Sequence, residues 1–208
     1  GGSVILYYIL PLKRRWVGLL FSSLLFYILA MKNLVVVVLF TTATIYLGAR
    51  IIEYLNEQFK LKKKGLDRSA RKELKSKTTT RNRYIIALLC LINFGILFTT
   101  KYFNFFGENI NTLFNALHIS TRIPFLDIFL PLGISFYTLS AISYVTDVAR
   151  GVCKAEKNYL RLLLFLIFFP IITEGPISRY GQLGEELKAE HRFDYKQFCF
   201  GAQLITWG

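Results

Sequence analysis

Apolar residues in this chain are grouped in long blocks, and short polar or basic stretches separate the blocks. The longest block runs from Tyr84 to Phe106 and carries one cation, Lys101, near its end. A helix that is apolar on every side has no polar face for water, so it must contact lipid or other buried helices. Because about 20 residues cross the hydrocarbon core of a bilayer, this block predicts a membrane-spanning helix.

Shorter apolar blocks predict further crossings, which gives about six spans in all. Their ranges are 4–12, 16–30, 34–47, 125–145 and 160–172. Residues 50–59 continue the third of these blocks with mixed polarity, which is typical of an amphipathic helical extension. The sequence therefore predicts an all-α integral membrane protein, built as a multi-span helical bundle.

The net charge of +13 is concentrated in one part of the chain. Eleven of the 26 Lys and Arg residues lie at positions 57–83, between two apolar blocks. The positive-inside rule places such a segment on the cytoplasmic side, so we expect a basic cytoplasmic loop there and a polar outer loop at 107–123. No aromatic platform or known binding motif interleaves these charges, and we expect no nucleic-acid partner.

The last apolar block ends in residues that break helices. Pro170 is followed by Gly175 and Pro176, with the acid Glu174 and the cation Arg179 on either side. Broken backbone at membrane depth is tolerated where it is buried in protein or lines a wet cavity. We therefore expect a helix break near Gly175-Pro176, and we take Glu174, Gly175, Pro176 and Arg179 as candidates for lining a substrate or donor channel. An ion pair that pins the turn is the alternative.

Small residues lie among large ones within the apolar stretch at 125–145. Pro131, Gly133 and Ser135 alternate with large side chains, a pattern that favours close helix packing over substrate contact. Asp147 and Arg150 are three residues apart at the end of this stretch, where they are expected to brace the following loop. We assign all five residues a structural role.

Spacing alone indicates no complete catalytic or metal centre. His118 and His191 lack a nearby Ser, Cys or carboxylate at a distance along the chain that is typical of a nucleophile or a metal site. Cys90, Cys153 and Cys199 are an odd number without close spacing, so they predict neither disulfides nor a zinc site. No metal is expected.

Two motifs resemble the membrane-bound O-acyltransferase (MBOAT) family. The first spans residues 130–137 and continues through 142–151, and the second comprises 168–170 and 175–180. In this order they resemble the bacterial branch that contains alginate O-acetylation proteins and the membrane protein that D-alanylates teichoic acids. The resemblance implies that residues 1–208 are the N-terminal portion of one MBOAT-like transmembrane domain.

This resemblance also implies a function. Such proteins move an acyl group, here most simply acetyl, from acetyl-CoA or an acyl carrier protein to a hydroxyl of a cell-envelope polysaccharide. The implied location is the bacterial cytoplasmic membrane, and the implied partners are the lipid bilayer, the acyl donor, and the polysaccharide or an extracytoplasmic transferase. No covalently bound cofactor is implied.

The family's catalytic His lies in a Trp-His motif, which neither His118 nor His191 matches. We expect that His beyond Gly208, and we expect this fragment alone to be inactive. Two alternatives remain at this point: D-alanyl transfer to teichoic acid, and a non-enzymatic transporter or scaffold that uses the same helix-broken cavity.

Overall fold

A computed structural model shows the chain as an assembly of helices. It describes residues 2–31, 35–63, 67–117, 124, 133–172, 175, 178–190 and 193–207. The α-helices are α1 (Gly2–Ile9), α2 (Arg15–Met31), α3 (Val35–Lys62), α4 (Arg68–Ala116), α5 (Ile134–Arg150), α6 (Tyr159–Ile167), α7 (Phe169–Ile172) and α8 (Tyr195–Trp207). A 3-10 turn, η1 (Leu12–Arg14), precedes α2, and a π-helical turn, η3 (Tyr180–Gly184), follows α7. These ranges contain no strand, which confirms the all-α class.

Three helical stretches in the described ranges are long and apolar enough to cross a membrane. They are Leu12–Met31, Val35–Lys62 and Arg68–Phe103. Most of the apolar window in each faces outward, since only 22%, 39% and 11% of these windows are buried inside the protein. An outward apolar surface of this kind matches lipid rather than water. The chain is therefore a helical membrane protein, and the larger number of about six spans stays a prediction.

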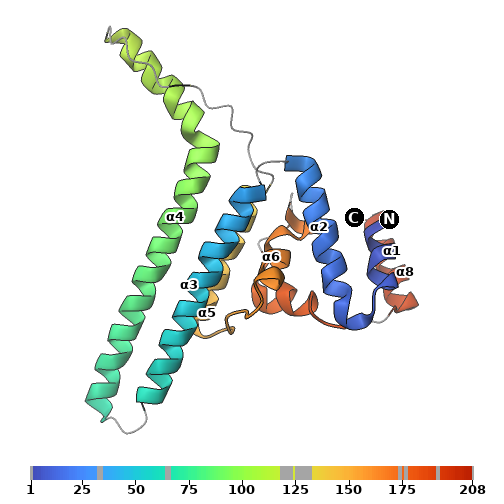
Figure 1. Ribbon diagram of the computed structural model, residues 1–208, viewed down its shortest axis with the longest axis horizontal. Helices are drawn as coiled ribbons and strands as arrows, with labels where there is room; N and C mark the ends of the chain where they lie inside the picture. The colour runs from blue at the N-terminus through green and yellow to red at the C-terminus, as the bar shows by residue number, and fades with distance from the viewer. Residues whose placement is uncertain are drawn as a thin grey trace.

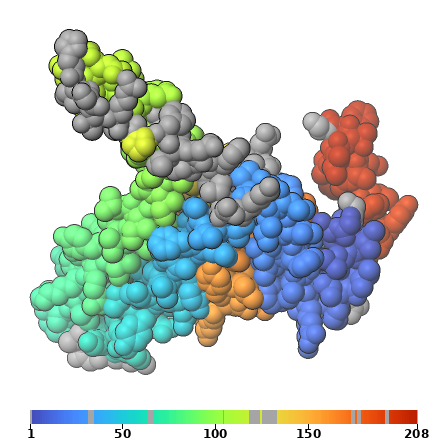
Figure 2. All heavy atoms as spheres, turned by 45° about the horizontal axis from the view of Figure 1, so that its top comes forward, coloured from blue at the N-terminus to red at the C-terminus, as the bar shows by residue number. Residues whose placement is uncertain are grey.

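Helix α3 lies at the centre of the arrangement (Figure 1). It packs against α4, α5 and α6, while α2 packs against α6 and α1. The buried apolar core lies where these helices meet and includes Tyr27, Ile45, Tyr144 and Leu163. Figure 2 shows the C-terminal part of α4 projecting beyond the other helices.

The basic segment at 57–83 is mostly helical, so the predicted loop is wrong for most of its length. Helix α3 continues to Lys62 and α4 begins at Arg68. Lys, Arg and Glu are good helix formers, and no Gly or Pro interrupts the chain from Arg68 until Gly95. The many Lys and Arg residues of this segment therefore lie on the C-terminal end of α3 and the N-terminal end of α4. The side of the membrane on which they lie stays a prediction.

The predicted outer loop at 107–123 is also wrong for its first part, because α4 continues to Ala116. Polar side chains there are satisfied within the helix. Asn109 and Thr112 each donate to the carbonyl four residues earlier, at 2.7 and 2.9 Å. Asn and Thr weaken a helix without breaking it, so a run rich in Asn stays helical. Residues 118–123 lie outside the described residues.

Polar side chains and a glycine join α3 to α4. Asn82 Nδ2 donates to Asn56 Oδ1 at 2.8 Å, and Asn93 Nδ2 lies 3.4 Å from Thr44 Oγ1. Gly48 lets the two backbones approach, because a Cβ there would collide with the side chain of Leu89. Small residues and hydrogen bonds are the usual means of helix association in lipid.

Glycines in the left-handed region mark both ends of α5. Gly133 precedes the helix at φ 69° and Gly151 ends it at φ 75°. At the C-terminal end, the N–H groups of Val152 and Gly151 donate to the carbonyls of Asp147 and Val148, which closes a Schellman motif. At the N-terminal end, a Cβ on Gly133 would collide with the carbonyl oxygen at the end of α7. Gly133 therefore allows α5 and α7 to meet.

Candidate functional site

A hollow of about 820 Å³ opens beside the loop that connects α5 to α6. We call it the Glu156 hollow. Its lining comes from the loop, the start of α6, and η3 with the residues after it: 152–159, Arg161, Tyr180, Gly181, Glu185 and Lys188. It lies where the α5–α6 loop and the start of α6 meet η3, which is about 20 residues further along the chain.

Glu156 is the centre of a buried hydrogen-bond network beside this hollow. Its Oε1 atom accepts from the N–H groups of Lys157 and Asn158, at 2.9 and 3.0 Å. Its Oε2 atom accepts from the Tyr180 hydroxyl and pairs with Lys188 Nζ at 3.0 Å. Only 8% of the Glu156 side chain is exposed. Both carboxylate oxygens thus have hydrogen-bond partners, so the Glu156 carboxylate ties its own loop to Tyr180 and Lys188.

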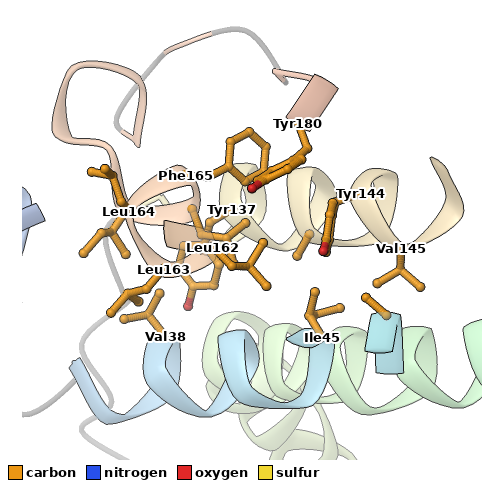
Figure 3. Packing of buried hydrophobic residues seen from close by; sticks show 14 of the residues in the cluster. Val38, Ile45, Tyr137, Tyr144, Val145, Leu162, Leu163, Leu164, Phe165 and Tyr180 are labelled. Carbon is orange, nitrogen blue, oxygen red and sulfur yellow. The ribbon is translucent and has the colours of Figure 1, made fainter. Parts of the chain in front are cut away.

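Aromatic packing places Tyr180 where it can reach Glu156. The Tyr180 ring lies 4.7 Å from that of Tyr144 on α5 and 5.1 Å from that of Phe165 on α6, centroid to centroid. Figure 3 shows Tyr180 beside Phe165 and facing Tyr144. The Tyr144 hydroxyl accepts from the Glu156 N–H at 2.7 Å. The network therefore joins α5, α6 and η3.

Helix α3 fixes the same loop from the other side. Glu53 Oε1 accepts from the N–H of Ala155 at 3.1 Å, and Glu53 Oε2 pairs with Arg50 at 2.8 Å. The Tyr46 hydroxyl donates to the carbonyl of Lys157 at 2.8 Å. Tyr46 and Glu53, about two turns apart on α3, thus hold Lys157 and Ala155 of the loop, which ties the loop to α3.

The charges of the network are set by competing effects. Burial raises the pKa of Glu156, but hydrogen bonds from Tyr180, from the N–H of Asn158 and from Lys188 outweigh burial, so the pKa lies below its ordinary 4.5. Burial lowers the pKa of Lys188, but Glu185 and Glu156 together raise it above 10.5. Both groups are charged at neutral pH, where neither exchanges a proton readily.

Cys153 also lines the Glu156 hollow. Its thiol is a poor nucleophile at neutral pH. Burial and the nearby carboxylates of Asp147 and Glu185 raise the pKa of its thiol to about 11. The thiolate is the reactive form, so this side chain remains a thiol and acts as a small apolar residue. Within the described ranges, no three His, Cys, Asp or Glu side chains lie close enough together to hold a metal ion.

Acid is expected to weaken the fold through Glu156. Because its pKa is lower in the folded state, the carboxylate stabilises the protein above pH 4.5, and this contribution is lost as pH falls through the folded pKa. The Tm should therefore decrease below that pH, and Glu156→Gln should flatten the decrease. Thermal unfolding of both proteins in neutral detergent over acidic pH checks this. Identical pH profiles would contradict the assignment.

The helix break predicted from sequence is present at Gly175. Helix α7 ends at Ile172, Gly175 is not helical, and η3 begins at Tyr180. The N–H of Gly175 donates to the carbonyl of Ile171 at 2.9 Å, and a Cβ at Gly175 would collide with Ile171. This confirms a break that packs closely against α7.

None of the candidate residues that the structure describes lines the Glu156 hollow. Arg179 is exposed and immediately precedes η3. On α5, Ser135 is half-buried in the first turn. Three further candidates, Glu174, Pro176 and Pro131, lie outside the described residues.

Asp147 and Arg150 lie in the last turn of α5 as expected, but no ion pair joins them in the described chain. Arg150 instead lines a separate hollow between α3, α4 and α5.

Sequence reasoning did not find Glu156, Tyr180 or Lys188 as partners. Glu156 is the only acid between Arg150 and Arg161, and a lone acid in a basic loop was the available signal. Tyr180 closes the second MBOAT-like motif. Nothing in the sequence pattern pairs Lys188 with a residue 32 positions earlier.

The chain matches named bacterial proteins over part of its length. It is 32% identical over 127 residues to a probable alginate O-acetylase of Pseudomonas syringae, a match that covers 60% of this chain and 23% of that protein. It is 26% identical over 152 residues to a peptidoglycan O-acetyltransferase of Helicobacter pylori, which covers 61% and 28%. It is 34% identical over 70 residues to a teichoic acid D-alanyltransferase of Bacillus subtilis, which covers 33% and 18%.

These matches span less than a third of each relative's own length. No family model matches the chain. No solved structure gives a significant match. The names of these relatives nevertheless agree with the family that the two motifs resemble, and the helical membrane architecture agrees with it too. The chain is an MBOAT-like membrane segment, similar to bacterial alginate O-acetylases and teichoic acid D-alanyltransferases.

Proposed function

We propose that this chain is part of a multi-pass O-acyltransferase of the bacterial cytoplasmic membrane that moves an acetyl group from a thioester donor to a hydroxyl of a cell-envelope polysaccharide. The observation that carries the proposal is similarity to proteins named as O-acetylases over 127 and 152 residues. D-alanyl transfer to teichoic acid is the second candidate, supported by a shorter match of 70 residues.

The proposed reaction is an exchange of a thioester for an ester. The acceptor oxygen attacks the thioester carbonyl, its proton passes to a base, the carbon–sulfur bond breaks, and the donor leaves as a thiol. The base is the family His, for which this chain has no matching residue. In this proposal the chain's own residues position the reactants: Gly175 and Arg179 line a channel, and the Glu156 network holds the surrounding helices in place.

A membrane setting explains why a helix break is useful in such an enzyme. Acetyl-CoA or an acyl carrier protein supplies the donor on the cytoplasmic side, and the acceptor polysaccharide or its partner transferase lies outside. A protein-lined break between helices lets both substrates reach one base without exposing backbone to lipid. The basic ends of α3 and α4 face the cytoplasm in this arrangement.

The sequence of the parent gene after the codon for Gly208 tests the proposal. The proposal predicts a Trp-His motif between further apolar blocks. A second set of helices similar to residues 4–172, without that motif, would favour a transporter with internal repeats and contradict the proposal.

The 208-residue chain alone is expected to transfer no acetyl group, because it has no residue that matches the family base. The purified 208-residue chain and the full-length protein, each in lipid nanodiscs, are incubated with the envelope polysaccharide and a labelled donor. The donor is acetyl-CoA or an acyl carrier protein that carries a labelled acetyl group. Base-labile label on the polysaccharide is then measured. Turnover by the 208-residue chain would contradict the assignment of the base.

A further inference from the structure

A second hollow, of about 640 Å³, lies where the end of α3, the first half of α4 and the end of α5 meet. We call it the basic hollow. Cations line it from all three helices and from the residue after α3: Lys60, Lys63, Lys75, Arg83 and Arg150. No Asp or Glu in the described ranges lines it. Four cations of the basic segment at 57–83 and Arg150 of α5 thus surround one concave surface.

The cations of the basic hollow have no acidic partners in the part of the chain that the structure describes. None of them takes part in an ion pair there. Two acids on the same helices pair elsewhere, Glu53 with Arg50 and Glu73 with Lys77, each at 2.8 Å. Glu57 on α3 and Asp147 on α5 do not line the hollow. Like charges around a concave surface with apolar walls repel one another and create a strong positive potential. An anion in the hollow would offset that repulsion.

One residue that lines the hollow, Asn82, also carries an unpaired hydrogen-bond acceptor. Asn82 is 6% exposed and donates through Nδ2 to Asn56 Oδ1 at 2.8 Å. Its Oδ1 atom is buried and has no hydrogen-bond partner among the described residues. A buried amide oxygen without a partner is unfavourable, and a donor hydroxyl on a ligand would satisfy it. Phe59 and Ile86 supply an apolar part of the wall.

We propose that the basic hollow binds the phosphate of a phosphate-bearing molecule that has a hydroxyl close to the phosphate. The guanidinium groups of Arg83 and Arg150 suit two phosphate oxygens at once, and the lysines add point charges. Asn82 accepts from the neighbouring hydroxyl. Two sources carry this chemistry: the headgroup of an anionic phospholipid such as phosphatidylglycerol, and a soluble polyol phosphate. The proposal does not depend on acyl transfer.

Two probes that share one headgroup distinguish these sources. The purified 208-residue chain in neutral detergent is exposed to phosphatidylglycerol, with phosphatidylcholine as the neutral lipid control, and native mass spectrometry counts the lipid retained. In a second arm, glycerol phosphate is titrated and binding is followed calorimetrically, with glycerol as the control. Retention of phosphatidylglycerol alone identifies a lipid headgroup, and saturable binding of glycerol phosphate identifies a soluble ligand. Either result supports the phosphate site.

Two matched variants distinguish binding by the cations of the basic hollow from a non-specific effect of the chain's net positive charge. The hollow variant removes three cations that line it: Lys63→Gln, Lys75→Gln and Arg150→Gln. The control variant removes three exposed cations of α3 and α4 that do not line it: Lys62→Gln, Lys72→Gln and Arg81→Gln. Both lose the same charge, and circular dichroism verifies that both are helical.

The hollow variant should bind the probe that the parent protein binds about 100-fold more weakly, since each of the three Lys or Arg residues near an anionic headgroup contributes about a fivefold effect. The control variant should remain within about threefold of the parent, because its three cations do not line the hollow and salt screens their attraction for a ligand bound there. Equal losses in the two variants would overturn the proposal. Failure of the parent protein to prefer either phosphate probe over its neutral control would also overturn it. Neither result bears on whether the full-length protein transfers acetyl groups.

Discussion

Replacement of Glu156 by alanine is expected to lower the free energy of unfolding by about 3–5 kcal/mol, the usual effect of removing one partner from a buried ion pair. The change leaves Lys188 half-buried without this partner, and it leaves the Tyr180 hydroxyl and two loop N–H groups without their acceptor. Thermal and denaturant unfolding in neutral detergent measure the loss.

The matched control is Glu185→Ala, which removes the other acid that pairs with Lys188. Glu185 is 64% exposed and lies three residues before Lys188. An exposed pair of this kind contributes about 0–1 kcal/mol. If both variants lose the same stability, Glu156 is not the centre of the network and the account of the α5–α6 loop is wrong.

Replacement of Gly133 by alanine is expected to destabilise the protein by about 2–5 kcal/mol. A left-handed backbone costs an alanine about 1–2 kcal/mol, and Gly133 has φ 69°. In addition, the new Cβ would collide with the backbone carbonyl of Ile172, and overpacking adds about 1–3 kcal/mol. The loss should appear as a lower unfolding midpoint, because α5 and α7 can no longer meet as closely.

Gly151→Ala supplies the control at the other end of α5. Gly151 has nearly the same backbone angle, φ 75°, but a Cβ there would meet nothing within 4 Å. Backbone strain is then the only penalty, about 1–2 kcal/mol. The difference between the two variants measures the close approach of Gly133 to α7. No difference would show that this approach does not contribute to stability.

Local sequence patterns predicted the apolar helices well. The block at 16–30 corresponds to α2 (Arg15–Met31), and the block at 84–106 lies within α4. The break near Gly175 was predicted because Pro and Gly act through the local backbone. Each of these features depends on residues close together in the chain, which is the information that periodicity and turn chemistry carry.

The extent of α4 was underestimated for a physical reason, whereas the helical extension predicted at 50–59 is present in α3, which continues to Lys62. Hydropathy marks where a helix leaves lipid, and it does not mark where the helix ends. Residues 68–83 are rich in Arg and Lys, which are good helix formers, so the same helix extends beyond its apolar block. The ends of the apolar blocks therefore mark a change in hydropathy rather than the ends of helices.

The partners in the Glu156 network could not be predicted from the sequence. Glu156 bonds Tyr180 and Lys188, which are 24 and 32 residues further along the chain, and its loop is held by Glu53 from more than 100 residues earlier. Such partners are brought together by helix packing. A single sequence shows which residues can ionise, but it does not show which of them meet.

Acyl transfer itself is tested most directly by comparing envelope polysaccharides from cells with and without the parent gene. Base-labile acetyl esters and D-alanyl esters are quantified in both, and the gene is then restored. The account predicts that acetyl esters disappear on deletion and return with the gene, while D-alanyl esters are unchanged. If both kinds of ester are the same in the two strains, the protein does not acylate the envelope and the proposed function is wrong.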